Sequence, residues 1–488
     1  MQKQNPDDFD IRNIEALSHR EAADLLGVDR DFVWSIPFDG NRVSDGPRLN
    51  TKAESIIREL ERRRTARRRT SDEARRFKAC VSSLTANLLA AWRISPNLQI
   101  GFPRGRGAYG TRSPFYRYRN PDLSYSQMRQ AFRGFLELGY VQIDHEGYWD
   151  QKSRKGRLTK IRGTEKLIGL LDQDGPLWPW EICQRPDSEV LVFKDEKKKR
   201  IDFTETEATC RMRESLRAIN NVLLAHWADL ELPDDKLRRL GEGMVADDDR
   251  QPLDLSRRTL YRVFNNRSFE QGGRFYGGWW QHVPRVYRPF IRINGERTTE
   301  LDYSSLHPRI LYALAGLQMI GDPYDMGLDP RHRDRVKETF NALVNASGNI
   351  EEPDIYQHEG LPLTFPELQE RIKERHKAIA HMFNSGFGLK GQSLDSSIAE
   401  KVLLRFAGRG ICCLPIHDSF VVPRNYEGDL QDVMLRAYRE VMDQEGEVKA
   451  EREVPSDPDD VPSESDRAKG FKDRLNAWFA WKEQGQPT

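Results

Sequence analysis

Two acidic residues that are distant in the sequence both stand at a junction between secondary-structure elements. In ELDYSSLHPRILYAL, residues 300 to 314, Asp302 follows an apolar strand and directly precedes a helix. In ICCLPIHDSFVVP, residues 411 to 423, Asp418 lies in a turn between two apolar strands. Carboxylates brought together from strand ends are the oxygen ligands that Mg²⁺ prefers, and Mn²⁺ is an alternative ion. The pattern predicts two-metal phosphoryl transfer with Asp302 and Asp418 as catalytic and metal-binding residues, whereas either aspartate alone would be an ordinary turn or cap residue.

The stretch RDRVKETFNALVNA, residues 333 to 346, has the spacing of a cationic helix face. Arg333 and Lys337 are four residues apart and therefore project from one side of a helix, where they could hold a triphosphate. The alternative is a solvated helix face, because Arg331, Arg335 and nearby acids are also charged.

These stretches resemble motifs of a known family, the family A DNA polymerases together with the single-subunit, phage-type RNA polymerases. DYSSLHPRIL is similar to the first palm motif, HDSF to the third, and RDRVKETFNALVNA to the fingers-helix motif. GGRFYGGWWQHVP is similar to the family's Gly-Arg element followed by Gln-x-x-Pro. The resemblance runs from about residue 265 to about residue 442. It implies a right-hand polymerase palm of α/β (α+β) type with reduced fingers, using a nucleic-acid template and primer and nucleoside triphosphates.

The resemblance also implies roles for individual residues. The nucleotide-binding residues would be Arg333, Lys337, His307, Asn341 and Asn345, and primer or template contacts would come from Arg274, Gln281, Arg309 and His417. The fingers motif departs from the family pattern, because a Tyr-Gly pair is usual where this chain has Asn345 and Ala346.

The motifs disagree about the sugar of the incoming nucleotide. His307 stands five positions after Asp302, where the DNA polymerases carry a Glu that blocks a ribose 2′-hydroxyl and the RNA polymerases carry a small residue. Because histidine is about as bulky as glutamate, we predict a preference for deoxynucleotides and therefore DNA-directed DNA synthesis. The expected template is a phage or plasmid-like replicon. Ser419 favours an RNA polymerase or primase of the same fold, since the DNA polymerases usually have Glu there. An alternative of another class is a DNA-binding replication initiator or regulator with a non-catalytic palm.

The residues around Arg274 offer two further features. Gly272 and Gly273 would let the backbone approach a nucleic-acid strand closely. The aromatic side chains that follow would form either a stacking surface or core, and they are Phe275, Tyr276, Trp279 and Trp280.

Upstream, the order helix, helix, basic hairpin predicts a winged helix-turn-helix-like, DNA-binding domain over residues 73–172. A helix over about 124 to 138, ending at Gly139, would place Gln127, Arg129, Gln130 and Arg133 toward the major groove. The wing would carry Lys152, Arg154, Lys155 and Arg157. The alternative is a small structural α+β domain with an exposed basic hairpin. Residues 1–72 are expected to form a basic arm or helices, which either contact nucleic-acid phosphates or are merely solvated.

The remaining segments complete the expected organisation of the 488 residues. Residues 173–262 are expected to be a helical connector or reduced thumb, with an exposed loop over 234–251. Palm and fingers would occupy 263–445, and an acidic linker with a C-terminal helix would occupy 446–488. Neither a signal peptide nor an apolar run long enough to cross a bilayer is visible, so we expect no membrane partner and a cytoplasmic protein.

Overall fold

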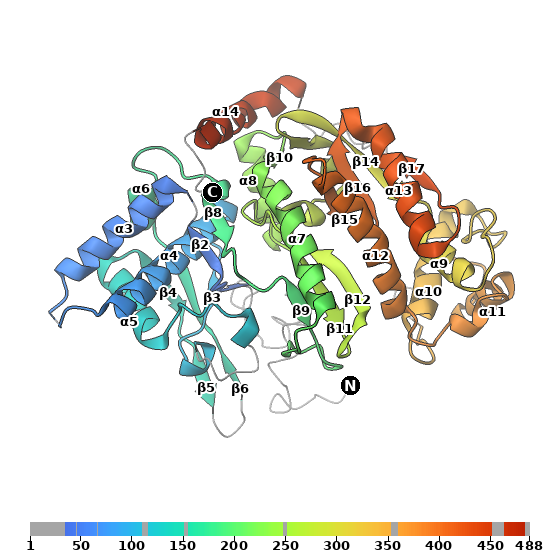
Figure 1. Cartoon of the computed structure of the whole chain (residues 1–488), viewed down its shortest axis with the longest axis horizontal. Helices are drawn as coiled ribbons and strands as arrows, with labels where there is room; N and C mark the ends of the chain where they lie inside the picture. Colours follow the sequence, from blue (N-terminus) through green and yellow to red (C-terminus); the bar gives the residue numbers. More distant parts are fainter. Residues whose placement is uncertain are drawn as a thin grey trace.

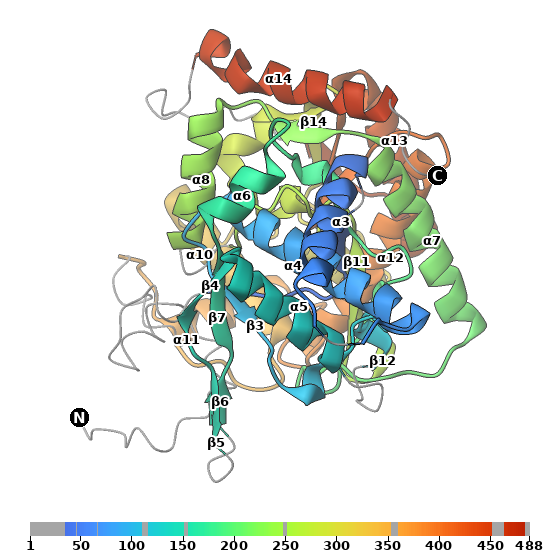
Figure 2. The same ribbon diagram turned by 90° about the vertical axis from the view of Figure 1, so that its left-hand side faces the viewer.

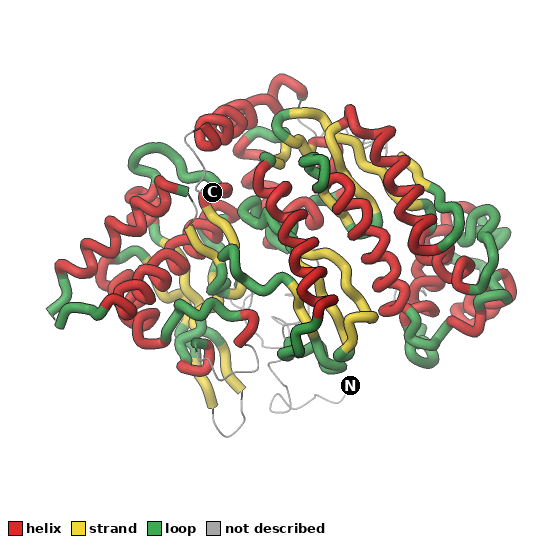
Figure 3. Tube along the Cα trace, viewed as in Figure 1, coloured by secondary structure: helices red, strands yellow, loops and turns green. Residues whose placement is uncertain are grey.

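The computed structural model describes residues 35–44, 46–65, 67–109, 116–150, 155–246, 251–352, 360–450 and 463–483. The chain is a mixed α/β protein with an N-terminal part on the left of Figure 1 and a larger C-terminal part on the right. Helices and strands occur in both parts (Figure 3). No helix within these ranges is both long enough and apolar enough to span a membrane.

The N-terminal part consists of helices around a four-stranded sheet with the strand order β1-β3-β7-β4. The strands are β1 (Ile36–Pro37), β3 (Ile100–Phe102), β4 (Val141–His145) and β7 (Thr159–Gly163). The helices are α3 (Pro47–Arg62), α4 (Ser71–Ile94), α5 (Tyr125–Leu138) and α6 (Glu165–Leu171). The short hairpin of β5 (Tyr148–Asp150) and β6 (Lys155–Arg157) projects from this part (Figure 2), and β2 (Arg42–Ser44) pairs with β8 (Ile182–Gln184).

The sequence specifies where these helices begin and end. Thr70 and Glu73 form a capping box at the start of α4, which satisfies backbone N–H groups that have no partner within the helix. The Ser124 side chain accepts from the backbone N–H of Gln127 at the start of α5. At the other end Gly139 adopts a left-handed conformation with φ of 68°, as a helix stop requires. The predicted helix and its stop are confirmed.

The C-terminal part is built on a six-stranded sheet. Five strands have the order β10-β13-β14-β16-β15, and the sixth, β17, pairs with β14. The strands are β10 (Ala228–Leu230), β13 (Ile291–Ile293), β14 (Glu296–Tyr303), β15 (Leu414–Ile416), β16 (Ser419–Pro423) and β17 (Val448–Ala450). Helices α7 (Glu207–Ala225), α12 (Gly388–Ala407) and α13 (Glu427–Met442) contribute to the same hydrophobic core. Figure 1 shows α7, α12 and α13 in front of the strands.

A three-stranded sheet with the order β12-β11-β9 lies against α12. Its strands are β9 (Leu191–Phe193), β11 (Tyr261–Asn265) and β12 (Ser268–Tyr276). Gly272 and Gly273 in β12 have φ of 82° and 87°, and a Cβ on Gly273 would come within 2.8 Å of the Ser396 hydroxyl. Gly273 therefore admits α12, and Gly272 admits Asn265 and Val263 of β11, so these glycines allow close packing within the chain, whereas the sequence suggested an approach to nucleic acid.

A separate small core supports three helices at the right of Figure 1. They are α9 (Leu306–Leu314), α10 (Arg333–Asn345) and α11 (Phe365–Arg375). Phe340, Leu368 and Ile372 are fully buried in this core. The helix α9 follows directly on β14, so this group of helices is joined to the strand that carries Asp302.

Two segments differ from the expected organisation. Residues 234–251 were expected to be a loop, but most of them form α8 (Asp234–Ala246), so that expectation is wrong. Two glycines and a run of acids suggested a loop, yet Leu237, Leu240 and Met244 have helical spacing and pack on the core. The N-terminal core extends from Leu49 to Ile182, across the expected boundaries at residues 72 and 172.

The C-terminal helix α14 (Glu464–Glu483) connects the two parts. In both Figures 1 and 2 it lies across the top of the molecule. Its Trp478 is fully buried and contacts Trp180 of the N-terminal part edge to face, with ring centroids 5.6 Å apart. Phe471 of the same helix packs on Trp227 of the C-terminal part. The helix therefore docks on the body of its own chain.

Candidate functional site

Asp302 and Asp418 lie at the same end of two neighbouring strands. Asp302 is the second-last residue of β14, and it pairs in register with Ser419, the first residue of β16. Asp418 immediately precedes Ser419 in the turn from β15, and His417 in this turn has a left-handed φ of 56°. Adjacent strands are about 4.8 Å apart, so the register brings the backbones of Asp302 and Asp418 close together at this end of the sheet.

Two further charged groups flank this pair. On the other side of β14, Lys449 of β17 pairs in register with Asp302, and its ammonium lies 3.8 Å from the carboxylate. Glu300 lies two residues before Asp302, where its carboxylate accepts hydrogen bonds from the Ser419 hydroxyl at 2.5 Å and from Arg288 at 3.1 Å. The site is thus a mixed cluster of carboxylates and cations.

Arg274 of β12 connects a buried acid with His307. Its Nε donates to Asp395 of α12 at 2.7 Å, and its Nη2 donates to Nε2 of His307 at 2.8 Å. Burial raises the pKa of Asp395 to about 6, the Arg274 charge opposes this, and the Asp418 charge adds to it. Burial, followed by the positive charge of Arg274, lowers the pKa of His307 to about 4. His307 is therefore neutral at ordinary pH and accepts at Nε2.

A small cavity of about 190 Å³ opens beside Arg274. Four of the predicted nucleotide or template residues line it, namely Arg274, His307, Asn341 and Asn345. The opposite wall is the start of α12, where Gly388 lies so close to Asn345 that a Cβ would meet the side-chain oxygen at 1.8 Å. The charge of Asp418 raises the pKa of His307, opposing its burial, so the cavity and the carboxylate pair act on each other electrostatically.

Arg333 and Lys337 lie one turn apart on α10, and both are exposed. Lys337 is close enough that its charge lowers the pKa of His307 in the cavity wall. Arg333 instead holds Asp322 through Nε at 2.6 Å and lies over the ring of Tyr324 at 5.0 Å. Of the two, Lys337 lies near His307 of the cavity wall, whereas Arg333 would have to leave Asp322 to bind a phosphate.

Two residues predicted to contact primer or template are used within the chain. Gln281 is buried, and its amide donates to the carbonyl of Phe275 at 2.9 Å and accepts from the N–H of Gly278, so it is engaged within the chain. Arg309 donates to the carbonyl of Ser304 at 2.8 Å and pairs with Glu447 just before β17. The contacts of Arg309 join the start of α9 to the residue before β17 at the end of β14, so Arg309 positions the site from behind.

The aromatic residues near Arg274 belong mainly to the core. Trp279 and Trp280 are each 1% exposed, and Phe275 is also buried. Trp280 donates through its indole N–H to the carbonyl of Pro415 in β15 at 3.0 Å. Only Tyr276 is exposed, so a stacking surface formed by the whole group is wrong.

The predicted DNA-binding residues of the N-terminal part are partly engaged internally. Gln127 is buried and accepts from Arg69 at 3.2 Å, which corrects its expected place on a groove-facing surface. Its position, four residues before Ala131 and eight before Phe135, places it on the buried side of α5. Gln130 also accepts from Arg69, Arg133 pairs with Glu137, and Arg129 is exposed. Lys155 begins β6, Arg157 lies over the ring of Tyr148, and Lys152 and Arg154 lie outside the described residues.

The donor set of Asp302 and Asp418 fits a hard divalent cation that is shared with a phosphate. Among the described residues, no group of three or more Asp, Glu, His or Cys side chains could enclose a metal ion. Mg²⁺ is commonly held by one or two carboxylates together with substrate phosphates and water, so a closed protein cage is not required. The two aspartates meet that requirement.

Sequence reasoning missed Asp395, Glu300 and Lys449. Asp395 lies 121 residues from its partner Arg274, in a helix whose neighbouring residues look like ordinary core. Lys449 lies in a three-residue strand beside an acidic stretch that reads as a linker. Glu300 had a usable signal, because residues two apart in a strand share a face and it stands two before Asp302.

The raised pKa of Asp395 predicts a pH dependence for binding of any anionic ligand that Arg274 holds in the cavity, such as the nucleotide proposed below. At or below about pH 6 the carboxyl takes up a proton and its charge no longer holds Arg274 at the cavity. We expect the KM for the proposed nucleotide substrate to rise up to about fourfold by pH 5.5, and Asp395→Asn to show a raised KM at every pH.

Unfolding would not explain such a rise. Because the pKa of Asp395 is higher in the folded chain, at about 6, than its ordinary 3.8, its contribution to stability increases as pH falls through 6. Steady-state kinetics between pH 5.5 and 8 with parallel thermal melts would separate the two effects. An unchanged inflection in Asp395→Asn would contradict the assignment.

Comparison with known proteins gives little guidance. No protein-family model matches the chain, and no curated protein matches it. Among solved structures, it is similar to the POL domain of Pol1 from M. smegmatis in complex with DNA primer-template and dNTP, with 14% identity and a TM-score of 0.29. The likeness covers 50% of this chain and 51% of that one, so this chain spans about half the length of the structure it matches. A TM-score this low leaves the function to be argued from the site.

Proposed function

We propose that this chain is a template-directed nucleotidyltransferase that carries out DNA-directed DNA synthesis on a phage or plasmid-like replicon. The observation that carries the proposal is the meeting of Asp302 and Asp418 at one end of β14 and β16, beside the cavity lined by Arg274 and His307. In this proposal the six-stranded sheet is the palm of a right-hand polymerase, and α10 and α11 are reduced fingers.

Each group has a chemical role in the proposed reaction. Magnesium ions held by Asp302 and Asp418 would supply Lewis-acid stabilisation of the triphosphate and of the attacking 3′-hydroxyl. Lys337 and, after release from Asp322, Arg333 would bind the triphosphate charge. Arg274, fixed between Asp395 and His307, would orient the nucleotide in the cavity.

The helix α7 supports a connector rather than a thumb. It packs along α12, and its Leu216, Ile219 and Leu223 are buried in the same core as the palm sheet. A thumb would extend away from the palm to grip duplex. In the N-terminal part, α5 precedes the β4–β7 hairpin and strand β7 lies between β3 and β4, an arrangement that supports the winged-helix interpretation.

Primer extension would test the proposed function. The full chain is incubated with Mg²⁺, a labelled primer annealed to a longer DNA template, and either dNTPs or rNTPs. We expect template-dependent extension with dNTPs. Extension without a primer would favour the primase alternative, and no incorporation of either nucleotide would favour a DNA-binding regulator with a non-catalytic palm.

His307 is predicted to discriminate against ribonucleotides. Its ring lines the cavity and is held there by Arg274, so an added 2′-hydroxyl would be buried against it without a good partner. Such burial costs about 1 to 3 kcal/mol, so His307→Ala should raise relative ribonucleotide incorporation about ten- to a hundredfold with little loss of dNTP use.

The control for this variant is His381→Ala, because His381 is exposed on the helix Ala380–Met382 and does not line the cavity. Competition between dATP and ATP at one template position measures the ratio. Equal use of both nucleotides by the unchanged enzyme would mean that His307 is not a sugar gate.

A further inference from the structure

A second cavity lies between the N-terminal and C-terminal parts and has a volume of about 400 Å³. Its walls are rich in tyrosine and arginine, so we call it the Tyr-Arg cleft. The N-terminal wall includes Tyr109, Tyr116 and Arg119, and the C-terminal wall includes Arg200, Arg257 and Tyr261. Nothing in the proposed chemistry of Asp302 and Asp418 uses these side chains.

The charge of the cleft is positive. The acids on its walls are Asp39 and Glu189, against the three arginines. Glu189 is already paired with Arg117 and Arg213, and Asp39 accepts hydrogen bonds from Asn41 and Gln184. The acids are therefore satisfied within the protein. Arg257 lies 3.4 Å from Asp254 and would exchange this carboxylate for a phosphate, so the positive charge of the walls favours a phosphate-bearing ligand.

The tyrosines offer flat surfaces at the entrance. Tyr116 is 51% exposed, and the ring of Tyr261 lies 6.2 Å from that of Tyr276, which is 36% exposed. Bases in a duplex are stacked on each other, so such rings can be used only by bases that are unpaired. Aromatic rings interleaved with arginines are the usual composition of a single-strand binding groove.

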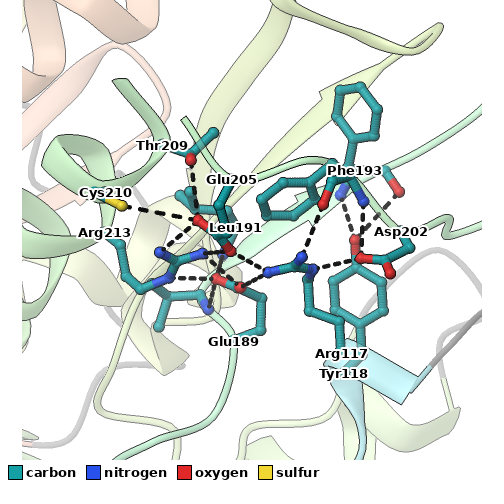
Figure 4. Close-up of polar contacts among 12 residues, drawn as sticks. Arg117, Tyr118, Glu189, Leu191, Phe193, Asp202, Glu205, Thr209, Cys210 and Arg213 are labelled. Carbon is teal, nitrogen blue, oxygen red and sulfur yellow. Dashed lines mark hydrogen bonds and ion pairs between the residues drawn. The ribbon is translucent and has the colours of Figure 1, made fainter. Parts of the chain in front are cut away.

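The two walls are held in fixed positions by the network in Figure 4. Arg117 of the N-terminal part pairs with Glu189, Asp202 and Glu205 of the other part. Its neighbour Tyr118 donates to the carbonyl of Ile201 at 2.8 Å and accepts from the N–H of Phe193 at 3.0 Å. Because the walls of the cleft are already ordered, less of the binding free energy is lost in ordering them around a ligand.

The cleft leads toward the carboxylate pair. Gly277 at its wall is three residues beyond Arg274 in the chain, a separation of about 10 Å along an extended strand. Arg257 on its wall is close enough to lower the pKa of His282, and so is His417, the residue before Asp418. His282 is thus near both a residue of the cleft wall and the turn that carries Asp418.

We propose that the Tyr-Arg cleft binds single-stranded nucleic acid, and that during synthesis it holds the unpaired template strand next to the site of Asp302 and Asp418. The role as a template path rests on the proposed function, whereas the binding of a single strand does not. Bases would stack on Tyr116 and Tyr261, and phosphates would pair with Arg200 and Arg257.

The test is fluorescence anisotropy of a labelled oligothymidylate of about 15 nucleotides with the full chain, in EDTA, over a series of salt concentrations. Loss of one stacked base costs about 1 to 3 kcal/mol, so Tyr116→Ala should weaken binding about five- to a hundredfold. Arg200→Ala should weaken binding and also reduce the slope of log K against log salt by about 0.7, the value for one lost phosphate contact on a single strand.

Matched controls are Phe479→Ala on α14, which is 42% exposed, and Arg439→Ala on α13, neither of which lines the cleft. The controls should bind as the unchanged chain does. Unchanged affinity of both cleft variants would overturn the proposal, and so would an equal loss of affinity for a blunt duplex. If the chain incorporates no nucleotide but the cleft variants have a lower affinity for the oligothymidylate, the proposed function is wrong and the proposal of single-strand binding in the cleft is supported.

Discussion

Replacing either Asp302 or Asp418 with asparagine is expected to lower the rate of nucleotide incorporation at least about a thousandfold, which corresponds to about 4 kcal/mol of activation free energy. Each substitution removes one negative charge from the point where β14 and β16 meet and leaves the side-chain volume unchanged. Glu300 nearby is engaged by Ser419 and Arg288, and among the described residues no group of three or more acids, His or Cys could enclose an ion, so each aspartate is expected to be needed.

The fold should tolerate both substitutions. Lys449 lies 3.8 Å from Asp302 with more than half of its own side chain exposed, and such surface pairs contribute less than about 1 kcal/mol. Thermal melting and oligonucleotide binding should therefore match those of the unchanged chain. Asp429→Asn is the matched control, because Asp429 forms an exposed pair with Arg409 away from this site. Incorporation within tenfold of normal by either aspartate variant would refute the catalytic assignment.

The residues that the sequence could locate were those tied to local signals. Asp418 interrupts an apolar run, and Asp302 stands shortly before the apolar helix that begins at Leu306, and both signals are visible without a structure. The caps at Ser124 and Gly139 are equally local, because one residue type satisfies one backbone requirement. Lys337 was also predictable, since the helix period alone decides which side of α10 it shares with Arg333.

The residues that the sequence could not locate depend on long-range packing. Arg274 was expected to contact nucleic acid directly, yet its direction is set by Asp395, which only the packing of β12 on α12 brings near. Gln281 and Arg309 look like free polar groups in the sequence, but the backbone carbonyls of Phe275 and Ser304 occupy them. A motif reveals the type of residue at a site, whereas the partners that orient it come from distant elements.

The largest expected effect on stability is at Arg474 of α14. Its guanidinium is buried and binds Asp229 at 2.8 Å, the carbonyls of Leu230 and Leu232, and Asp234. Arg474→Met would leave the carboxyl of Asp229 buried without a cation, which costs about 3 to 5 kcal/mol. Chemical denaturation monitored by tryptophan fluorescence would measure it, because Trp478 on the same helix packs against Trp180 of the N-terminal part.

Three comparisons separate this cause from a general loss of packing. Lys472→Ala, an exposed position on the same helix, should change the unfolding free energy by less than about 0.5 kcal/mol. Arg474→Met combined with Asp229→Leu should be more stable than Arg474→Met alone, because no buried charge remains.

The third comparison is the pH dependence of the defect. Burial raises the pKa of Asp229 while Arg474 lowers it, so without Arg474 that pKa rises further. A group whose pKa is raised by folding loses stability as pH rises through that value, so the defect of Arg474→Met should shrink toward pH 5. A defect of equal size at pH 5 and pH 8 would mean that α14 is held by its tryptophans alone.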